Sequence, residues 1–437
     1  MPQLSLEEIC FERGSVVDPV GKVFYFEGRV FRAIAGPYVD FVERTVESAH
    51  RGNWFDIGLV PTWRTSYTLP GYPLVIEHRR IPFVTLRGEW CGEGLRDAAL
   101  CILRLSAELL RSNLYLKDAH PWNILFDGVK PFFVDWGSIC ASTELNWEFW
   151  YRQFRQYLVA PLHAFSIGEH RIARAMLREH KFGVGNELIE LPGFRNRPDT
   201  PRYIAESAGL CPTPETFEAL AQYVSDLHIP TVEGEWTAYA QPQFPEHGDG
   251  TTLREKDRIV FRLLERDSGR TVIDIGTNNG LHSEMAASLG KRTLACDIEE
   301  TCLNALYRRT REHGFDVLPL YHDFLWPIGT SGILNTIPAA EDRLACDTAL
   351  VMALTHHLAF KQHVSFEAMA LGLSRLARLR AIVEFVPPED RHVALWSPER
   401  LPWYNLTNFI AAMRRHFKSH SIIASEPHPR CMIEFDK

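Results

Sequence analysis

The chain has 437 residues, more than one ordinary domain, of which 46% are hydrophobic and 23% charged. Its formal net charge of -8 excludes the basic surface of a nucleic-acid-binding protein. The first ten residues carry acids where a signal peptide carries bases, no stretch approaches about 18 uninterrupted apolar residues, and the nine cysteines form no CxxC pair. These features predict a cytoplasmic protein without a membrane or nucleic-acid partner, a disulfide framework or a metal site.

Strand signals dominate the start of the chain, and helix signals follow them. Residues 14–34 contain two aromatic and β-branched segments around Glu27-Gly28, which predicts a short hairpin, and residues 73–86 predict a second pair of strands. From Gly94 onward, apolar residues recur at helical spacing. Two further helices are expected at about 146–165 and 168–181.

The segment 229–250 is rich in proline, glycine and acids, which is typical of a linker between domains. We therefore predict a first domain over 1–245, with a strand-rich lobe at 1–90 and a helical lobe at 91–228. The second domain covers 251–437. Neither domain shows an internal repeat or a low-complexity tract.

Strands and helices alternate through the second domain. Strands are expected in the sequences TVIDIG, RTLACDI, DVLPLYHDF, TALVMAL, RAIVEFV, SIIAS and CMIEF. Helices are expected at about 253–267, from His282, and at about 299–313, 366–378 and 405–417. This alternation predicts the α/β fold class, with a mainly parallel, doubly wound sheet of the Rossmann-like kind.

A motif that suits phosphoryl transfer lies in the first domain. Asp118 and Asn123 in DAHPWN have the spacing at which kinases place an acid that accepts the substrate proton and an amide that holds magnesium. Further along, Asp135 in VDWG stands where the second metal-binding acid belongs. Together these motifs resemble the aminoglycoside- and choline-kinase type of phosphotransferase, over about residues 95–180.

The upper part of a kinase nucleotide site is missing from the sequence. The chain has no G-x-G-x-x-G loop and no V-A-I-K strand, and Lys22 is the nearest candidate for the lysine that anchors phosphates. The first domain is therefore expected to be an α+β, protein-kinase-like domain with poor affinity for nucleotides.

The strongest chemical signal is the sequence VIDIGTNNG. An apolar strand reaches Asp274 and turns through Gly276 and Gly280 into a helix, which brings backbone amides and a helix N-terminus close to a ligand. A dinucleotide fingerprint would have glycine where this chain has Asn278 and Leu281, so NAD or FAD binding is disfavoured. The loop predicts a cradle for some other cofactor.

Acids follow the next two strands. Asp297, with Ile298 beside it, ends the second strand, where a carboxylate can accept both hydrogen bonds of a ribose diol. After the third strand, Asp323 offers a carboxylate to an adenine amino group, and Phe324 offers an aromatic surface to its ring. These features resemble the class I S-adenosylmethionine (SAM)-dependent methyltransferases. The resemblance implies SAM as cofactor, with the glycine loop, including Asn278, around its methionine moiety.

His356 and His357 follow the fourth strand, at the edge where open α/β sheets bind their ligands. Methyl transfer depends mainly on in-line positioning, and a histidine could also remove the proton from an acceptor hydroxyl or amine. Alternatively, one imidazole caps the turn and the other packs against the cofactor. The sequence leaves both interpretations open.

In combination, these motifs look like a bacterial family of two-part methyltransferases related to a nodulation protein, which join a kinase-like half to a class I methyltransferase. The likeness implies methyl transfer to oxygen, nitrogen or carbon of a small molecule, such as a secondary metabolite or a saccharide. The kinase-like half is then expected to shape the acceptor site, to act as a scaffold or to transfer phosphoryl groups. The alternatives are an ATP- and magnesium-dependent phosphotransferase and a non-catalytic SAM-binding protein. The acceptor, other reactions of the cofactor and the oligomeric state stay open.

Overall fold

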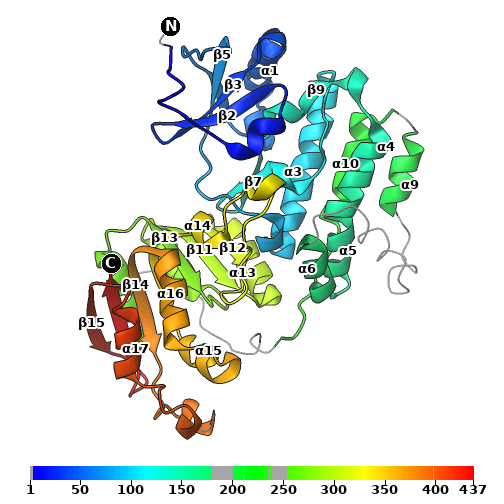
Figure 1. Ribbon diagram of the computed structural model, residues 1–437. Coiled ribbons are helices and arrows are strands. Elements are labelled where there is room, and N and C mark those ends of the chain that lie inside the picture. The colour runs from blue at the N-terminus through cyan, green and yellow to red at the C-terminus, as the bar shows by residue number, and fades with distance from the viewer. Residues whose placement is uncertain are drawn as a thin grey trace. The chain divides into compact units, whose positions relative to one another are not determined.

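The structure is a computed structural model that describes residues 3–178, 200–209, 211–234, 237, 244, 253–396 and 398–437. Over these residues the chain divides into two compact units (Figure 1). Unit 1 comprises Met1–Gly88, Gly92–Pro230 and Thr330–Ile337, and unit 2 comprises Glu89–Cys91, Thr231–Gly329 and Pro338–Lys437. Each unit therefore contains one short segment from the other half of the sequence.

Unit 1 begins with an antiparallel sheet in the order β1-β2-β3-β5-β4. Its strands are β1 (Cys10–Phe11), β2 (Gly21–Phe26), β3 (Arg29–Ile34), β4 (Thr62–Arg64) and β5 (Leu74–His78), and α1 (Val39–Arg51) and α2 (Trp54–Ile57) lie between β3 and β4. Glu27 and Gly28 both have positive φ, as a tight hairpin turn between β2 and β3 requires, so the predicted hairpin is confirmed. The second predicted strand pair is wrong, because only β5 forms within 73–86. The chain leaves the sheet before Pro82, which has no N–H to donate to a ladder.

Helices dominate the rest of unit 1. They are α3 (Gly92–Arg111), α4 (Trp147–Phe154), α5 (Ala160–Ser166), α6 (His170–Arg178), α9 (Thr200–Ser207) and α10 (Pro214–Ser225). A π-helical turn, Arg155–Val159, joins α4 to α5, so the helix predicted at 146–165 is confirmed with this irregularity. Residues 179–181 of the next predicted helix lie outside the described residues. The described part of the unit also has two two-stranded antiparallel sheets: β6 (Leu114–Leu116) with β9 (Ile139–Ala141), and β7 (Ile124–Asp127) with β8 (Lys130–Phe133).

Unit 2 is built on a mixed sheet in the order β12-β11-β10-β13-β14-β16-β15. The strands are β10 (Thr271–Ile275), β11 (Arg292–Asp297), β12 (Val317–Tyr321), β13 (Cys346–Val351), β14 (Ala377–Phe385), β15 (Ser419–Ala424) and β16 (Cys431–Asp436). The first five strands are parallel, and β16 and β15 are antiparallel to their neighbours. The predicted mainly parallel α/β sheet is confirmed.

Helices connect and cover these strands. They are α11 (Glu255–Arg266), α12 (Leu281–Ser288), α13 (Glu300–His313), α14 (Ala340–Arg343), α15 (Thr355–Gln362), α16 (Phe366–Leu376) and α17 (Leu406–Met413). The chain winds from β10 outward to β12 and then returns to the other side of β10 with β13. Because crossovers between parallel strands are right-handed, this reversal places the two sets of helices on opposite faces of the sheet. It also creates a switch point between β10 and β13. Throughout the described residues, no helix is both long enough and apolar enough to cross a membrane.

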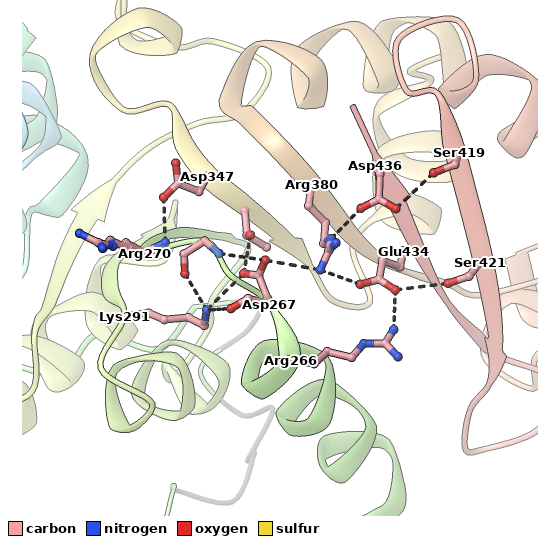
Figure 2. Close-up of polar contacts among 12 residues, drawn as sticks. Arg266, Asp267, Arg270, Lys291, Asp347, Arg380, Ser419, Ser421, Glu434 and Asp436 are labelled. Carbon is pink, nitrogen blue, oxygen red and sulfur yellow. Dashed lines mark hydrogen bonds and ion pairs between the residues drawn. The ribbon is translucent and has the colours of Figure 1, made fainter.

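Ion pairs connect the amino-terminal ends of the parallel strands (Figure 2). Lys291 contacts both the backbone and the carboxylate of Asp267, whose other oxygen lies 3.4 Å from Arg380. Arg380 also pairs with Glu434 at 3.0 Å and Asp436 at 2.8 Å, both on β16. These contacts hold the C-terminal hairpin of β15 and β16 against the parallel strands. They leave the carboxyl ends of the parallel strands available for a ligand.

The segment Glu89–Cys91 is bound to unit 2 by a buried ion pair. Both Glu89 oxygens accept hydrogen bonds from Arg343 of α14, at 2.6 and 2.9 Å, and both side chains are at most 2% exposed. Next to it, Trp90 forms an antiparallel bridge with Leu320 and so covers the edge strand β12. A segment from the N-terminal half of the sequence is thus part of the core of unit 2.

Candidate cofactor and acceptor site

A cavity of about 500 Å³ opens at the carboxyl ends of the parallel strands in unit 2. Gly276 and Asn278 after β10 line it on one side of the switch point, and Met352 and Ala353 after β13 line it on the other. Open α/β sheets bind their ligands at this position, because two loops diverge there and leave a crevice. The cavity therefore lies where the sequence predicts the cofactor.

Asn278 adopts the left-handed conformation that the turn after β10 requires. Its φ is 51°, and asparagine tolerates this region better than most residues other than glycine. The backbone N–H of Asn278 donates to Asp297 at 2.7 Å. Asparagine in place of a fingerprint glycine is thus compatible with the loop. Ala353, across the cavity, is also left-handed, with a φ of 52°, a strained conformation of the kind that collects at ligand sites.

Asp274 and Gly280, both predicted to bind the cofactor, do not line the cavity. Asp274 is 1% exposed, and its Oδ2 accepts hydrogen bonds from the hydroxyls of Thr277 and Ser283 at 2.9 and 2.7 Å. Burial raises the pKa of this carboxyl, and the two hydroxyls partly oppose the shift. Asp274 therefore fixes the loop from behind. The sequence pattern cannot distinguish this role from direct contact, because both put the acid at the strand end.

Gly280 is required by packing and by its backbone conformation. Its φ is 88°, and a Cβ there would approach Leu306 of α13 to under 3.0 Å. Gly280→Ala should therefore destabilise unit 2 by about 2 kcal/mol or more, from left-handed strain plus a steric clash. Gly290→Ala is the matched control, since its φ of 76° brings the same strain but a Cβ there meets nothing within 4 Å. Urea denaturation of both variants checks this, and equal losses would contradict the packing role.

Asp297 occupies the centre of the nucleoside end of the cavity. Its Oδ1 accepts the backbone N–H groups of Ile298 and Glu299 at 2.7 and 2.9 Å, and its Oδ2 accepts that of Asn278. Burial raises the pKa of Asp297, whereas the three N–H donors favour the charged form. Oδ2 accepts one of these bonds and so keeps acceptor capacity toward the cavity. Ile298, beside it, is 51% exposed and also lines the cavity.

Asp323 and Phe324 line the same end, from the loop after β12. Asp323 Oδ1 accepts backbone N–H groups of Leu325 and Trp326 at 2.9 and 3.2 Å, which fixes the carboxylate. Because β11 and β12 are parallel neighbours, and His322 N–H donates to the Asp297 carbonyl, the two acids lie at adjacent strand tips. The structure brings the predicted ribose and adenine residues together.

His356 and His357 line the far end of the cavity, at the start of α15. Their rings are 4.1 Å apart, and Trp396 lies 5.5 Å from His356 in a stacked arrangement and 5.1 Å from His357. His356 is only 4% exposed, and His357 is half-buried. The two imidazoles therefore occupy different environments within one aromatic cluster.

Burial, together with the neighbouring His357 and Arg430, lowers the pKa of His356 to about 2. In the unfolded chain the His356 imidazole takes up a proton near pH 6.5, whereas in the folded chain it stays neutral at this pH. Stability from the neutral imidazole is therefore complete above pH 6.5 and is lost as the pH falls below it, by about 1.4 kcal/mol per pH unit. His356→Phe, which keeps a ring against Trp396, should reduce this slope between pH 6.5 and 5. Urea midpoints at several pH values test it, and an unchanged slope would contradict the assignment.

The sequence did not point to several residues that line the far end: Lys361, His392, Trp396 and Arg430. Lys361 belongs to α15, His392 and Trp396 follow β14, and Arg430 precedes β16. None of them lies in a motif, and Arg430 joins the others only because β16 returns antiparallel beside β14. No local sequence pattern could have identified them.

The predicted kinase-like motif lies in unit 1. Asp118 and Asn123 come from the segment between β6 and β7, and Asp135 follows β8. Arg32 of β3 is buried and pairs with Asp135 at 3.0 Å and with Asp18. The Oδ1 atom of Asp135 also accepts the backbone N–H two residues later, at 3.0 Å. The acid expected to bind a metal is thus already paired with a guanidinium.

Lys22, the candidate phosphate anchor, directs its ammonium group to the carbonyl oxygens of Ser15 and Asp18, at 3.2 and 2.7 Å. Within the described part of the chain, no group of three or more His, Cys, Asp and Glu side chains could hold a metal ion. A magnesium ion at Asp135 would have to compete with the Arg32 guanidinium for Oδ1.

Comparison with known proteins supports the predicted relationship. No protein-family model matches the chain. Nodulation protein NoeA of Rhizobium meliloti (strain 1021) is 26% identical over 411 residues, which are 87% of this chain and 86% of that protein. The chain is similar to NoeA along most of its length. The predicted similarity to a nodulation protein is thereby confirmed along most of the sequence, in both units.

Solved structures also match, at lower similarity. Magnesium protoporphyrin IX methyltransferase (ChlM) from Synechocystis PCC 6803, with bound SAM, is 17% identical over 41% of this chain and 77% of its own, with a TM-score of 0.31. Monomeric WbdD is 16% identical over 46% of this chain and 47% of its own, with a TM-score of 0.32. N-methyltransferase NodS from Bradyrhizobium japonicum WM9 is 13% identical over 42% and 95%, with a TM-score of 0.31.

Proposed function

We propose that unit 2 is a SAM-dependent methyltransferase domain that transfers a methyl group to a small-molecule acceptor. The observation that carries this proposal is the pair of acids, Asp297 and Asp323, at adjacent strand tips of one cavity beside the switch point. A carboxylate at each tip can bind a ribose diol and an adenine amino group at the same time. The strand order agrees with the class I methyltransferase fold predicted from the sequence.

Each predicted residue that lines the cavity has a role that its contacts allow. Gly276 and Asn278 present backbone to the methionine moiety, and Asp297 accepts hydrogen bonds from the ribose. Asp323 accepts from the adenine amino group, and Phe324 covers the ring. SAM supplies a methyl group already activated by its sulfonium, so the protein contributes mainly orientation and exclusion of water.

Proton removal from the acceptor falls to His357 rather than His356. A general base works best when its pKa lies near the working pH, and burial holds the pKa of His356 at about 2. His357 is half-buried, lines the cavity and stands beside Trp396. In this proposal, His356 serves as a neutral packing partner that orients His357 and Trp396.

The role of unit 1 stays a prediction. Shaping the acceptor site or acting as a scaffold needs no metal, whereas phosphoryl transfer needs the magnesium site that the Arg32–Asp135 ion pair disfavours. Methyl transfer is therefore the favoured activity, and an ATP- and magnesium-dependent phosphotransferase is the alternative that the next experiment tests.

Two measurements on the full chain test the proposal. S-adenosylhomocysteine (SAH), the demethylated product of SAM, should raise the melting temperature, whereas ATP with magnesium should not. Incubation with methyl-labelled SAM and an extract of the source organism should then produce a small molecule that carries the label. Stabilisation by ATP with magnesium alone would favour the phosphotransferase. If SAH binds but no labelled product forms, the result would favour a non-catalytic SAM-binding protein.

A further inference from the structure

The charged side chains at the far end of the cavity already interact with other protein groups. Arg430, which is 8% exposed, pairs with Asp390 at 2.8 Å and with Glu384 at 3.5 Å. His392 accepts a hydrogen bond from Arg391 at 3.1 Å. These groups do not require a charged acceptor. An acceptor can therefore be recognised through the uncharged surface of this end.

Trp396 forms the centre of that uncharged surface. In the described part of the chain, all of its ring contacts are with side chains of α15: His356 at 5.5 Å, His357 at 5.1 Å, Phe360 at 6.0 Å and the ammonium group of Lys361 at 5.5 Å. These four positions span less than half of the helix circumference, because an α-helix has 3.6 residues per turn. The indole thus lies across one side of α15. It is half-buried and lines the cavity.

The surroundings of Trp396 hold this surface in place. Phe360 contacts both Trp396 and Tyr404, and the ring of Tyr404 is only 1% exposed. Aliphatic Leu354 and Leu358 line the same cavity. A fixed aromatic surface binds a planar ring with little loss of conformational entropy, and such ring pairs are favourable beyond the area that they bury.

The base proposed above limits the kind of hydroxyl that this end suits. His357 lines the cavity, with its ring 5.1 Å from that of Trp396. An unperturbed imidazole has a pKa of about 6.5, and a phenol has a pKa of about 10. The pKa of an aliphatic hydroxyl is close to that of water, about 15.7. An imidazole can therefore take a proton from a phenol far more easily than from an aliphatic alcohol.

We propose that the acceptor, given the proposed function, is an uncharged planar ring with a phenolic hydroxyl, which lies against Trp396 and donates its O–H to His357. The hydroxyl oxygen forms a bond to the methyl carbon as the carbon–sulfur bond breaks, and that electron pair stays on sulfur. The hydroxyl proton passes to the His357 imidazole. The products are a methyl ether, neutral SAH and an imidazolium, so the positive charge of the sulfonium is conserved.

Calorimetry on the full chain saturated with SAH tests the contact with the ring. The probes are 4-hydroxybenzamide and trans-4-hydroxycyclohexanecarboxamide, which are both neutral and similar in size, but only the first is planar. The planar probe should bind at least about threefold more tightly. Trp396→Leu should remove most of this preference. Trp63→Leu, at a 44% exposed tryptophan of unit 1 that does not line the cavity, should leave it unchanged.

His357→Phe tests the contact with the hydroxyl. The variant keeps a ring beside Trp396 but cannot accept a proton. It should weaken the binding of 4-hydroxybenzamide by at least about threefold, the effect of one hydrogen bond. The methyl ether 4-methoxybenzamide has no hydroxyl to donate, so its affinity should change less. Equal changes for the two probes would overturn the phenol assignment.

The outcomes separate this inference from the proposed function. If SAH does not bind to the unaltered chain, both fail. If SAH binds but the saturated probe binds as tightly as 4-hydroxybenzamide, or neither binds, only the acceptor proposal is overturned. An equal preference in Trp396→Leu and Trp63→Leu would also overturn it. SAH binding by each variant shows that it is folded, and Trp396→Phe, which keeps a smaller ring, should retain part of the preference.

Discussion

Asp297→Ala should weaken SAH binding by at least about a hundredfold, because it removes the acceptor for the ribose diol and frees three backbone N–H groups. Two charge-assisted hydrogen bonds to the ribose account for most of this loss. Asp297→Asn, which keeps one acceptor oxygen, should bind SAH with an affinity between those of the unaltered chain and Asp297→Ala. Isothermal calorimetry with SAH measures all three affinities.

Asp316→Ala is the control for this experiment. Asp316 is an exposed acid next to β12, it pairs only at the surface with Arg292, and it does not line the cavity. Its replacement should leave the SAH affinity unchanged. If Asp297→Ala binds SAH as well as Asp316→Ala does, the carboxylate has no part in nucleoside binding.

Glu89→Ala should destabilise unit 2 by about 3–5 kcal/mol, because it leaves the Arg343 guanidinium buried without its partner. Both side chains are at most 2% exposed, so water cannot replace the lost contacts. SAH should bind unit 2, so the unfolding transition that SAH moves to higher urea concentration belongs to unit 2. The loss should appear there.

Two comparisons test the cause of this loss. The pair Arg202–Glu206 is exposed, with side chains 59% and 55% accessible. Replacing Glu206 by alanine should therefore lower the free energy of unfolding by at most about 1 kcal/mol. Replacing both buried partners, Glu89→Leu with Arg343→Met, should recover much of the stability, since no unpaired charge remains. A double variant as unstable as Glu89→Ala would contradict the explanation from unpaired charge.

Local patterns in the sequence predict much of the fold. The β2–β3 hairpin follows from Glu27-Gly28 between two apolar segments, and the parallel strands of unit 2 follow from apolar runs that alternate with amphipathic helices. Asp297 and Asp323 can be placed because the carboxyl ends of neighbouring parallel strands must meet at one edge. In these cases the information lies within a few residues of the feature.

Contacts between distant parts of the chain cannot be predicted in this way. Glu89 precedes the long helix α3 of unit 1, and nothing nearby indicates its pairing with Arg343 in unit 2. Arg430 reaches the cavity only because the antiparallel strand β16 lies beside β14. Asp274 has the spacing of a cofactor ligand, yet two hydroxyls, identifiable only in three dimensions, hold it behind the loop.

A crystal structure of the chain with SAH tests the central claim most directly. The nucleoside should lie across the carboxyl ends of β10 and β11, with the ribose hydroxyls on Asp297 and the adenine between Asp323 and Phe324. The sulfur should point toward the end lined by His357 and Trp396. SAH bound elsewhere, or a cavity that stays empty at saturating SAH, would contradict the account.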